Sequence, residues 1–222
     1  MSLAVVHTRA NVGIQAPLIT VEVHLSSGLP GFTLVGLPET VVKESRERVR
    51  SAILHSGLEF PLQRITINLA PADLPKGGGR FDLAIAVGIL AASGQLGDAE
   101  LTKYEFLGEL SLSGEVRWVR GVLPGLLAAA SDERKAIVPK ANEQEAALLG
   151  NNDVLLCEHL LQVLGHLCGE DVLPGPTAAV PEALEVHGDL ADVRGQATAK
   201  RALLLAAAGG HNLLLRGPPG TG

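Results

Sequence analysis

The sequence ends in a glycine-rich loop whose spacing is that of a phosphate-binding site. The P-loop pattern is G-x-x-x-x-G-K-[ST], and its first six positions are matched by Gly217, Pro218, Pro219, Gly220, Thr221 and Gly222. In such a loop, backbone N–H groups point at the phosphates and the lysine reaches the β and γ groups. The sequence stops before the lysine, so we expect these 222 residues to bind nucleotide weakly or not at all. An ordinary proline-glycine loop is the alternative.

The residues that lead into the loop have the pattern that a P-loop requires. Positions 213–215 are three leucines, which we expect to form the buried strand that feeds the loop. Before them, the sequence from about 196 to 208 predicts a helix. Because the motif is cut before its lysine, we interpret the sequence as the N-terminal part of a longer protein.

Apolar periodicity predicts an α/β fold for the rest of the chain. Short or alternating apolar runs predict strands at 3–8, 18–25, 32–36, 64–70, 135–139 and 153–157. Helical spacing predicts helices at 39–57, 81–94, 122–133, 142–150 and 158–168. Between 104 and 121, two alternating runs around Ser113-Gly114 predict a hairpin. Hairpins mixed with strand-helix-strand units indicate a mixed sheet.

A proline-containing stretch divides the chain. Pro174, Pro176 and Pro181 lie in the segment 171–186, which has little periodicity and is predicted to be a linker. We therefore expect a complete domain over 1–170 and the opening part of a second domain over 187–222.

Composition excludes several functional classes. A formal net charge of −6 argues against a broad basic face of the kind that grips duplex DNA unaided. No apolar run reaches the roughly 20 residues that cross a bilayer, and the first residues lack the features of a signal peptide. The two cysteines fit a reducing compartment. We expect a cytoplasmic protein without a membrane partner.

Three long motifs resemble one known family. They are GLPETVVKESRERVRSAI at 36–53, RITINLAPADLPKGGGRFDLAIAVGILAASG at 64–94 and AKRALLLAAAGGHNLLLRGPPGTG at 199–222. In this order they resemble the YifB/ComM family of magnesium-chelatase-like AAA+ proteins. The resemblance implies a Lon-protease-like N-terminal domain, also called ribosomal S5 domain 2-like, followed by the start of a P-loop AAA+ module.

The resemblance also implies what the longer protein does. It would be a hexameric, ATP-driven DNA helicase that promotes branch migration when DNA is integrated in natural transformation. ATP and Mg²⁺ would be its cofactors, and single-stranded or branched DNA would be its partner. In AAA+ ATPases a segment at a helix start lies beside the adenine, and the positions that resemble it here are Val193, Arg194, Gly195 and Gln196. We expect no cofactor bound to this chain alone.

Two other functions remain open at the level of sequence. A protein-remodelling or chelatase-like ATPase would share the P-loop and differ in its substrate. A non-enzymatic module that binds DNA or protein would not need the nucleotide at all. In either case the N-terminal domain is expected to act as a scaffold or to guide a substrate.

The likeness to Lon raises the hypothesis of a Ser-Lys peptidase, which the residues do not support. The segment that matches Lon's serine loop, 75–82, contains no serine, and the segment that matches its lysine, 120–129, contains no lysine. A serine nucleophile needs a nearby base that takes its proton. Since both partners are missing, we predict no proteolysis.

Two cations in the same glycine loop are candidates for a contact with DNA or with a neighbouring subunit. They are Lys76 and Arg80 in the stretch LPKGGGRFD. The alternative is a simple turn into the next helix, in which Asp82 lies near the positive helix N-terminus. Similarly, Arg46 and Arg50 share a helix face that could bind phosphate, although a solvated face with ion pairs is the simpler interpretation.

Two further sets of residues could bind a metal or a nucleic acid by their types, but their positions favour simpler interpretations. Zinc-ligand side chains occur at Cys157, His159, His166 and Cys168. If these positions lie on one helix, the two cysteines are about 16 Å apart, so we expect no metal there. Trp118 is expected to pack in the core or against the sheet, the alternative being an exposed ring that stacks on a base.

Overall fold

The computed structural model describes residues 2–36, 44–97, 99–149, 153–177 and 188–218. Its contacts divide the chain into two units, Met1–Ala179 and Val180–Gly222, which are treated separately below. The division falls inside the segment 171–186 that the sequence predicts as a linker. In the parts of the chain described, no helix has the length and apolar character needed to cross a membrane.

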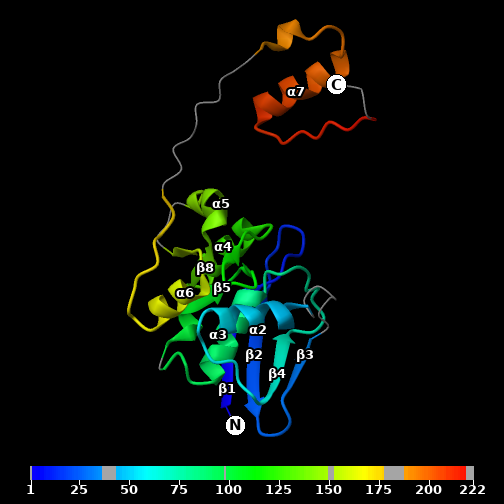
Figure 1. The fold of residues 1–222 in the computed structure, drawn as a ribbon. Helices are drawn as coiled ribbons and strands as arrows, with labels where there is room; N and C mark the ends of the chain where they lie inside the picture. The colour runs from blue at the N-terminus through cyan, green and yellow to red at the C-terminus, as the bar shows by residue number, and fades with distance from the viewer. Residues whose placement is uncertain (1, 37–43, 98, 150–152, 178–187, 219–222) are drawn as a thin grey trace. The chain divides into compact units, whose positions relative to one another are not determined.

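The first unit is built on a seven-stranded sheet in the order β3-β4-β2-β1-β5-β8-β9 (Figure 1). The strands are β1 (Ser2–Arg9), β2 (Leu18–Ser26), β3 (Gly31–Val35), β4 (Arg64–Ala70), β5 (Tyr104–Phe106), β8 (Lys135–Pro139) and β9 (Val154–Cys157). The β1-β2 and β2-β4 pairs are antiparallel, and the other four pairs are parallel. The α/β class with a mixed sheet is therefore confirmed.

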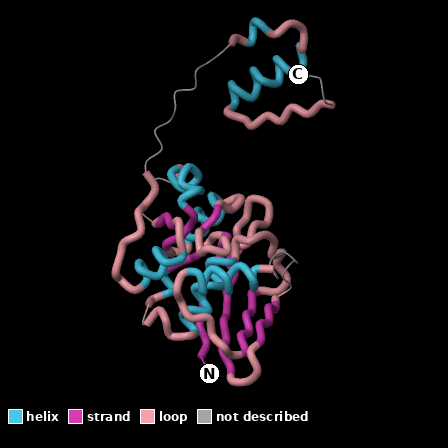
Figure 2. The backbone as a smooth tube through the Cα atoms, viewed as in Figure 1, coloured by secondary structure: helices cyan, strands magenta, loops and turns pink. Residues whose placement is uncertain are grey.

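The described part of this unit contains five α-helices, and some of them lie in front of the sheet in Figure 2. They are α2 (Ser45–His55), α3 (Asp82–Ala92), α4 (Val122–Ser131), α5 (Glu143–Ala147) and α6 (Leu160–Leu167). All residues of α3 except Ala91 are buried, as its continuous apolar sequence predicts. A Cβ on Gly88 would lie 2.6 Å from Val23 Cγ2, so glycine is what lets α3 approach β2 closely.

The two halves of the sheet are covered differently. In β2, buried positions alternate with partly exposed ones, which is the pattern of a strand covered on one face. In β9 every residue is buried. Leu156 of β9 packs in one apolar cluster with Leu126 of α4, while Leu155 packs in another cluster with Leu160 of α6. The parallel half therefore has helices on both faces.

The predicted hairpin is correct only in its second part. The turn at Gly114, where φ is +95°, joins the short strands β6 (Glu109–Leu110) and β7 (Val116–Arg117). The apolar run before this turn forms β5 of the main sheet instead. It lies between β1 and β8, which both pair with it through backbone hydrogen bonds. Trp118, which we expected to be packed, is 51% exposed.

A buried ion pair joins the two halves of the sheet. Strand β1 meets β5 through one residue pair, His7 opposite Glu105. Beside it, Arg9 Nε and Nη2 donate to Glu105 Oε2 and Oε1 at 2.7 and 2.6 Å, and the Glu105 side chain has no exposed surface. Arg9 Nη2 also donates to Asp132 Oδ2 at 2.5 Å, and Arg134 Nη1 lies 3.4 Å from Glu105 Oε1. The two hydrogen bonds from Arg9 to Glu105 therefore connect β1 and β5 where the strands pair through a single residue pair.

We predict that Glu105→Gln destabilises the first unit by about 3 kcal/mol, because it leaves the guanidinium of Arg9 buried without its main counter-charge. The free energy of unfolding in urea, followed by circular dichroism, measures the loss. Lys103→Gln is the matched control, since Lys103 pairs with Glu100 at the surface and its loss is expected to change nothing measurable. Equal stability of the Glu105 variant and the control would contradict the prediction.

Candidate nucleotide-binding cleft

The second unit is a short helical segment followed by an extended one. A single turn at Leu190–Asp192 begins at Asp189, whose carboxylate accepts a hydrogen bond from Ala191 N at 2.8 Å. Gly195 and Gln196 then have φ values of +68° and +51°, which reverse the chain into α7 (Ala197–Gly209). The predicted helix is confirmed. A left-handed backbone is costly for glutamine, and such strain occurs mostly at functional sites.

Four of the residues predicted to hold nucleotide line one cleft of about 700 Å³. Val193 and Gln196 line it from the turn before α7, and Gly217 and Pro218 line it from the start of the glycine loop. Arg194 and Gly195 are not among the lining residues. The remaining loop positions, Pro219, Gly220, Thr221 and Gly222, lie outside the described residues.

Sequence reasoning missed the helical wall of this cleft. Ala199, Lys200 and Leu203 line it from α7, together with Leu190, Leu215 and Arg216. A signal was present, because Gln196, Lys200 and Leu203 recur at the i, i+4, i+7 spacing that places side chains on one helix face. These residues add apolar side chains and two cations, Lys200 and Arg216, to the lining of the cleft.

The strand expected at 213–215 does not form. Residues 211–218 have no regular secondary structure, and Leu214 is 88% exposed. A strand is held by hydrogen bonds to a neighbouring strand, and the described residues of this unit, 188–218, contain no strand that could pair with it. The cleft is therefore lined by the turn before α7, by α7 and by the beginning of the glycine loop, and no strand pairs with the residues that lead into this loop in the described part of the unit.

Lys76 and Arg80, the candidate contacts in the first unit, are both buried. Lys76 Nζ donates to the carbonyl oxygens of Pro71 and Leu74 at 2.5 and 3.0 Å, and burial lowers its pKa. Arg80 is 6% exposed. In this structure Lys76 holds the turn before α3 together, and its contact with DNA or another subunit stays a prediction.

Asp82 has a stronger role than a simple helix-terminal charge. It is the first residue of α3, and its carboxylate receives hydrogen bonds from Arg48 Nε and Nη2 at 2.6 and 3.1 Å. Leu110 N donates to the same carboxylate at 3.3 Å. Asp82 thus connects α2, α3 and β6. Burial raises its pKa to about 6, although Arg48 acts in the opposite direction.

Arg46 and Arg50 lie over aromatic rings. Their guanidinium carbons are 5.9 Å from the centre of the Phe32 ring and 5.4 Å from that of Phe60, respectively. Arg46 also pairs with Glu47 at 3.4 Å, in line with the solvated face that we expected.

The zinc-type side chains lie on different elements, in line with the strand predicted at 153–157 and the helix predicted at 158–168, so the condition that one helix carries all four is not met. Cys157 is buried at the end of β9, and burial raises its pKa. His159 precedes α6 and its Nδ1 accepts from Leu161 N at 3.1 Å, while Cys168 follows the helix. Among the described residues there is no group of three metal-ligating side chains.

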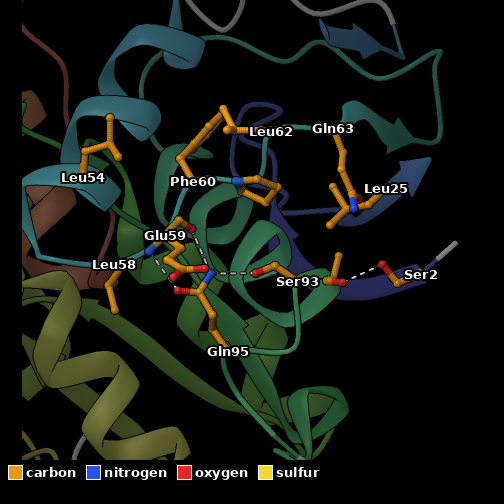
Figure 3. Close-up of a pocket in the computed structure, with 12 residues that line it drawn as sticks. Ser2, Leu25, Leu54, Leu58, Glu59, Phe60, Leu62, Gln63, Ser93 and Gln95 are labelled. Carbon is orange, nitrogen blue, oxygen red and sulfur yellow. Dashed lines mark hydrogen bonds between the residues drawn. The ribbon is translucent and has the colours of Figure 1, made fainter. Parts of the chain in front are cut away.

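A pocket of about 830 Å³ that the sequence did not indicate lies at the edge of the first unit (Figure 3). Its wall includes Leu54 and Leu62, and the amide side chain of Gln95 bonds to the backbone of Glu59 in both directions, at 3.0 and 2.9 Å. The lining residues come from segments far apart in the chain, so no local pattern could reveal it. Its lining has little charge and suits packing more than catalysis.

The raised pKa of Asp82 predicts a specific pH dependence. The folded chain takes up a proton near pH 6 and the unfolded chain near 3.8, so the stability that Asp82 contributes is complete below about pH 4 and is lost as the pH rises through 6. Relative to Asp82→Asn, the free energy of unfolding of the unmodified protein should fall by up to about 3 kcal/mol between pH 4 and 7. Asp73→Asn, at an exposed loop position, is the control. If the free energy of unfolding of the unmodified protein instead rose relative to that of Asp82→Asn as the pH increased, the prediction would be wrong. The attraction of Arg48 would then outweigh the effect of burial on the pKa of Asp82.

Comparison with known proteins places these features in a family. A family model described as subunit ChlI of Mg-chelatase matches residues 21–142, and a model described as magnesium chelatase, subunit ChlI, matches residues 189–222. The competence protein ComM of Haemophilus influenzae is 55% identical over 227 residues, covering 100% of this chain and 45% of ComM. The uncharacterised protein YifB of Escherichia coli is 57% identical, covering 100% of this chain and 44% of YifB.

A more distant relative gives the same picture. An uncharacterised protein of Mycobacterium bovis is 44% identical over 211 residues, which are 95% of this chain and 42% of the relative. The chain thus spans less than half the length of the curated relatives that it matches. With one family model over more than half of its residues and full coverage by ComM and YifB, the chain belongs to the YifB/ComM family of magnesium-chelatase-like proteins.

Proposed function

We propose that this chain is the N-terminal part of a ComM-like AAA+ ATPase that moves DNA strands during branch migration and the integration of DNA in natural transformation. The observation that carries the proposal is the cleft in which Val193 and Gln196 lie with Gly217, since these are the positions where a motor of this kind would hold adenine and phosphate. The magnesium-chelatase model over 189–222 and the name of the Haemophilus relative support it.

The residues of the cleft fit ATP bound as its magnesium complex. Apolar side chains of Val193, Leu203 and Leu215 can pack on a base, while Lys200 and Arg216 can balance phosphate charge. In the longer protein, the lysine that completes the P-loop would reach the β and γ phosphates, and Mg²⁺ would neutralise their charge. In the proposed ATPase, the residues of this cleft would position the nucleotide.

We further propose that the two domains, over 1–170 and 187–222, have separate tasks in a hexameric ring. The Lon-like domain would act as a scaffold or guide single-stranded or branched DNA to the motor. A chelatase-like ATPase is the second candidate, because the descriptions of both family models name magnesium chelatase. A protein-remodelling ATPase would share the P-loop and differ in its substrate.

The cleft makes a prediction for a protein that contains the complete P-loop module. Val193→Glu places a carboxylate where the base would pack, and we expect it to raise the Kd for ATP at least about tenfold, a loss of about 1.4 kcal/mol. Equilibrium titration with a fluorescent ATP analogue measures this. Arg194→Gln is the control, since Arg194 does not line the cleft. If only the Arg194 variant loses affinity, our assignment of the adenine position is wrong.

The response of the ATPase rate to DNA distinguishes the DNA motor from a chelatase-like ATPase. The steady-state ATPase rate of the complete protein should rise severalfold on addition of single-stranded or branched DNA, and the effect should weaken as salt is increased. A chelatase-like enzyme would ignore DNA. A rate that does not change with DNA at low salt would therefore reject the DNA motor and retain the ATPase.

A further inference from the structure

We propose that a pocket beside the glycine loop of the first unit binds a carboxylate group, which Arg80 holds by hydrogen bonds. The site lies in a different unit from the nucleotide cleft and does not depend on the proposed ATPase. Its ligand would be a small organic acid or the carboxylate at the end of a peptide.

The pocket has a volume of about 510 Å³. The glycine loop at 77–79 forms part of its wall, and Arg80, Glu109, Trp118 and Arg120 line it as well. Gly79 lies close to the side chain of Glu109, so a Cβ there, 2.2 Å from Glu109 Oε2, would have to displace that side chain. The loop is pinned in place, since Gly108 N donates to Arg80 O at 3.0 Å and Asp82 N donates to Gly79 O at 3.0 Å. The pocket is therefore built by fixed backbone.

Arg80 is buried without a carboxylate partner. Its Nη1 is 3.4 Å from Arg120 O, and neither Nε nor Nη2 has a hydrogen-bond partner among the residues that the structure describes. The other two inward-facing arginines of this unit, Arg9 and Arg48, each contact a carboxylate at 2.7 Å or less. A buried guanidinium offers five N–H donors, and leaving them unpaired is costly.

No neighbouring acid takes the place of that partner. Glu145 attracts Arg80, but its Oε2 accepts from Val122 N and Leu123 N at 3.2 and 3.4 Å, and its Oε1 accepts from Asn142 Nδ2 at 3.1 Å. Burial lowers the pKa of Arg80 to about 10, which still leaves it charged at neutral pH. A ligand that brings a planar pair of oxygens would satisfy the guanidinium.

Glu109 selects the charge of the ligand. Its carboxylate also lines the pocket and would repel a group that carries two negative charges. A carboxylate brings one charge in the geometry that matches arginine, whereas phosphate near pH 7.5 is largely a dianion. Trp118 at the pocket gives the ligand's carbon skeleton a half-exposed ring on which to pack.

The protein carries its own reporter, because Trp118 is its single tryptophan. Its fluorescence should be titrated at pH 7.5 and constant ionic strength with acetate, N-acetylglycylglycine and inorganic phosphate, with sodium chloride as the reference. We expect a saturable change with the two carboxylates and a Kd for phosphate at least fivefold weaker. Tighter binding of the peptide than of acetate would identify a chain end as the source, and equal binding a free acid.

Variants separate this site from a general salt effect. Arg80→Gln should abolish the change, Arg80→Lys should weaken it severalfold, and both should keep the circular dichroism of the unmodified protein. Arg117→Gln is the matched control, because Arg117 lies next to Trp118 in sequence and lines a neighbouring pocket. If the Arg80 variants do not fold, the titration of the unmodified protein decides. An unsaturable response, an unchanged response in Arg80→Gln, or binding of phosphate alone would overturn the proposal.

Discussion

The fold of the first unit depends on how β1 is joined to β5. The antiparallel half, β3-β4-β2-β1, and the parallel half, β5-β8-β9, meet through one residue pair, which is a narrow connection for a seven-stranded sheet. The Arg9–Glu105 pair, with Asp132 and Arg134 beside it, adds charge-assisted hydrogen bonds where backbone bonds are few. This contact, together with α3, which packs against β1 and β2 on one side and β5 on the other, sets how the two halves of the sheet lie relative to each other.

Three arginines of the first unit, Arg9, Arg48 and Arg80, differ in how their guanidinium groups are paired. Arg9 of β1 pairs with Glu105 of β5, and Arg48 of α2 pairs with Asp82 at the start of α3. Arg80 lies between these structural pairs in the same region and has no acid of its own within the described residues. Two satisfied pairs make the surroundings rigid, so a third guanidinium can be kept buried at a pocket without rearranging the core. This difference in pairing is the main support for our proposal that the pocket beside the loop binds a ligand.

Local patterns predicted the elements well, and long-range partners account for most of what was missed. The helix at α3 and the alternation in β2 follow directly from period and apolar content. The run at 213–215 reads as a strand but stays irregular, because pairing depends on residues that are remote or absent from the described chain. Trp118 is a large apolar residue that is exposed, and Lys76 is a charged residue that is buried. Burial depends on which distant segments pack around a residue, and the residue type alone does not determine it. The resemblance predicted a nucleotide site at positions that include Val193 and Gln196, which line the candidate cleft, whereas the residues of α7 that line it were not predicted.

The apolar helix α3 has a consequence for the order in which the chain folds during synthesis. A helix buried on nearly all sides is insoluble until its neighbours cover it, and the elements with which it makes most of its contacts, β1, β2 and α2, all precede it in the sequence. By the time α3 leaves the ribosome, most of its binding surface is already outside, so the antiparallel half can form without waiting for β8 and β9. Vectorial synthesis therefore shortens the period in which this segment is open to aggregation. A circular permutation that moved α3 ahead of β1 would keep every contact of the final fold and lose that protection.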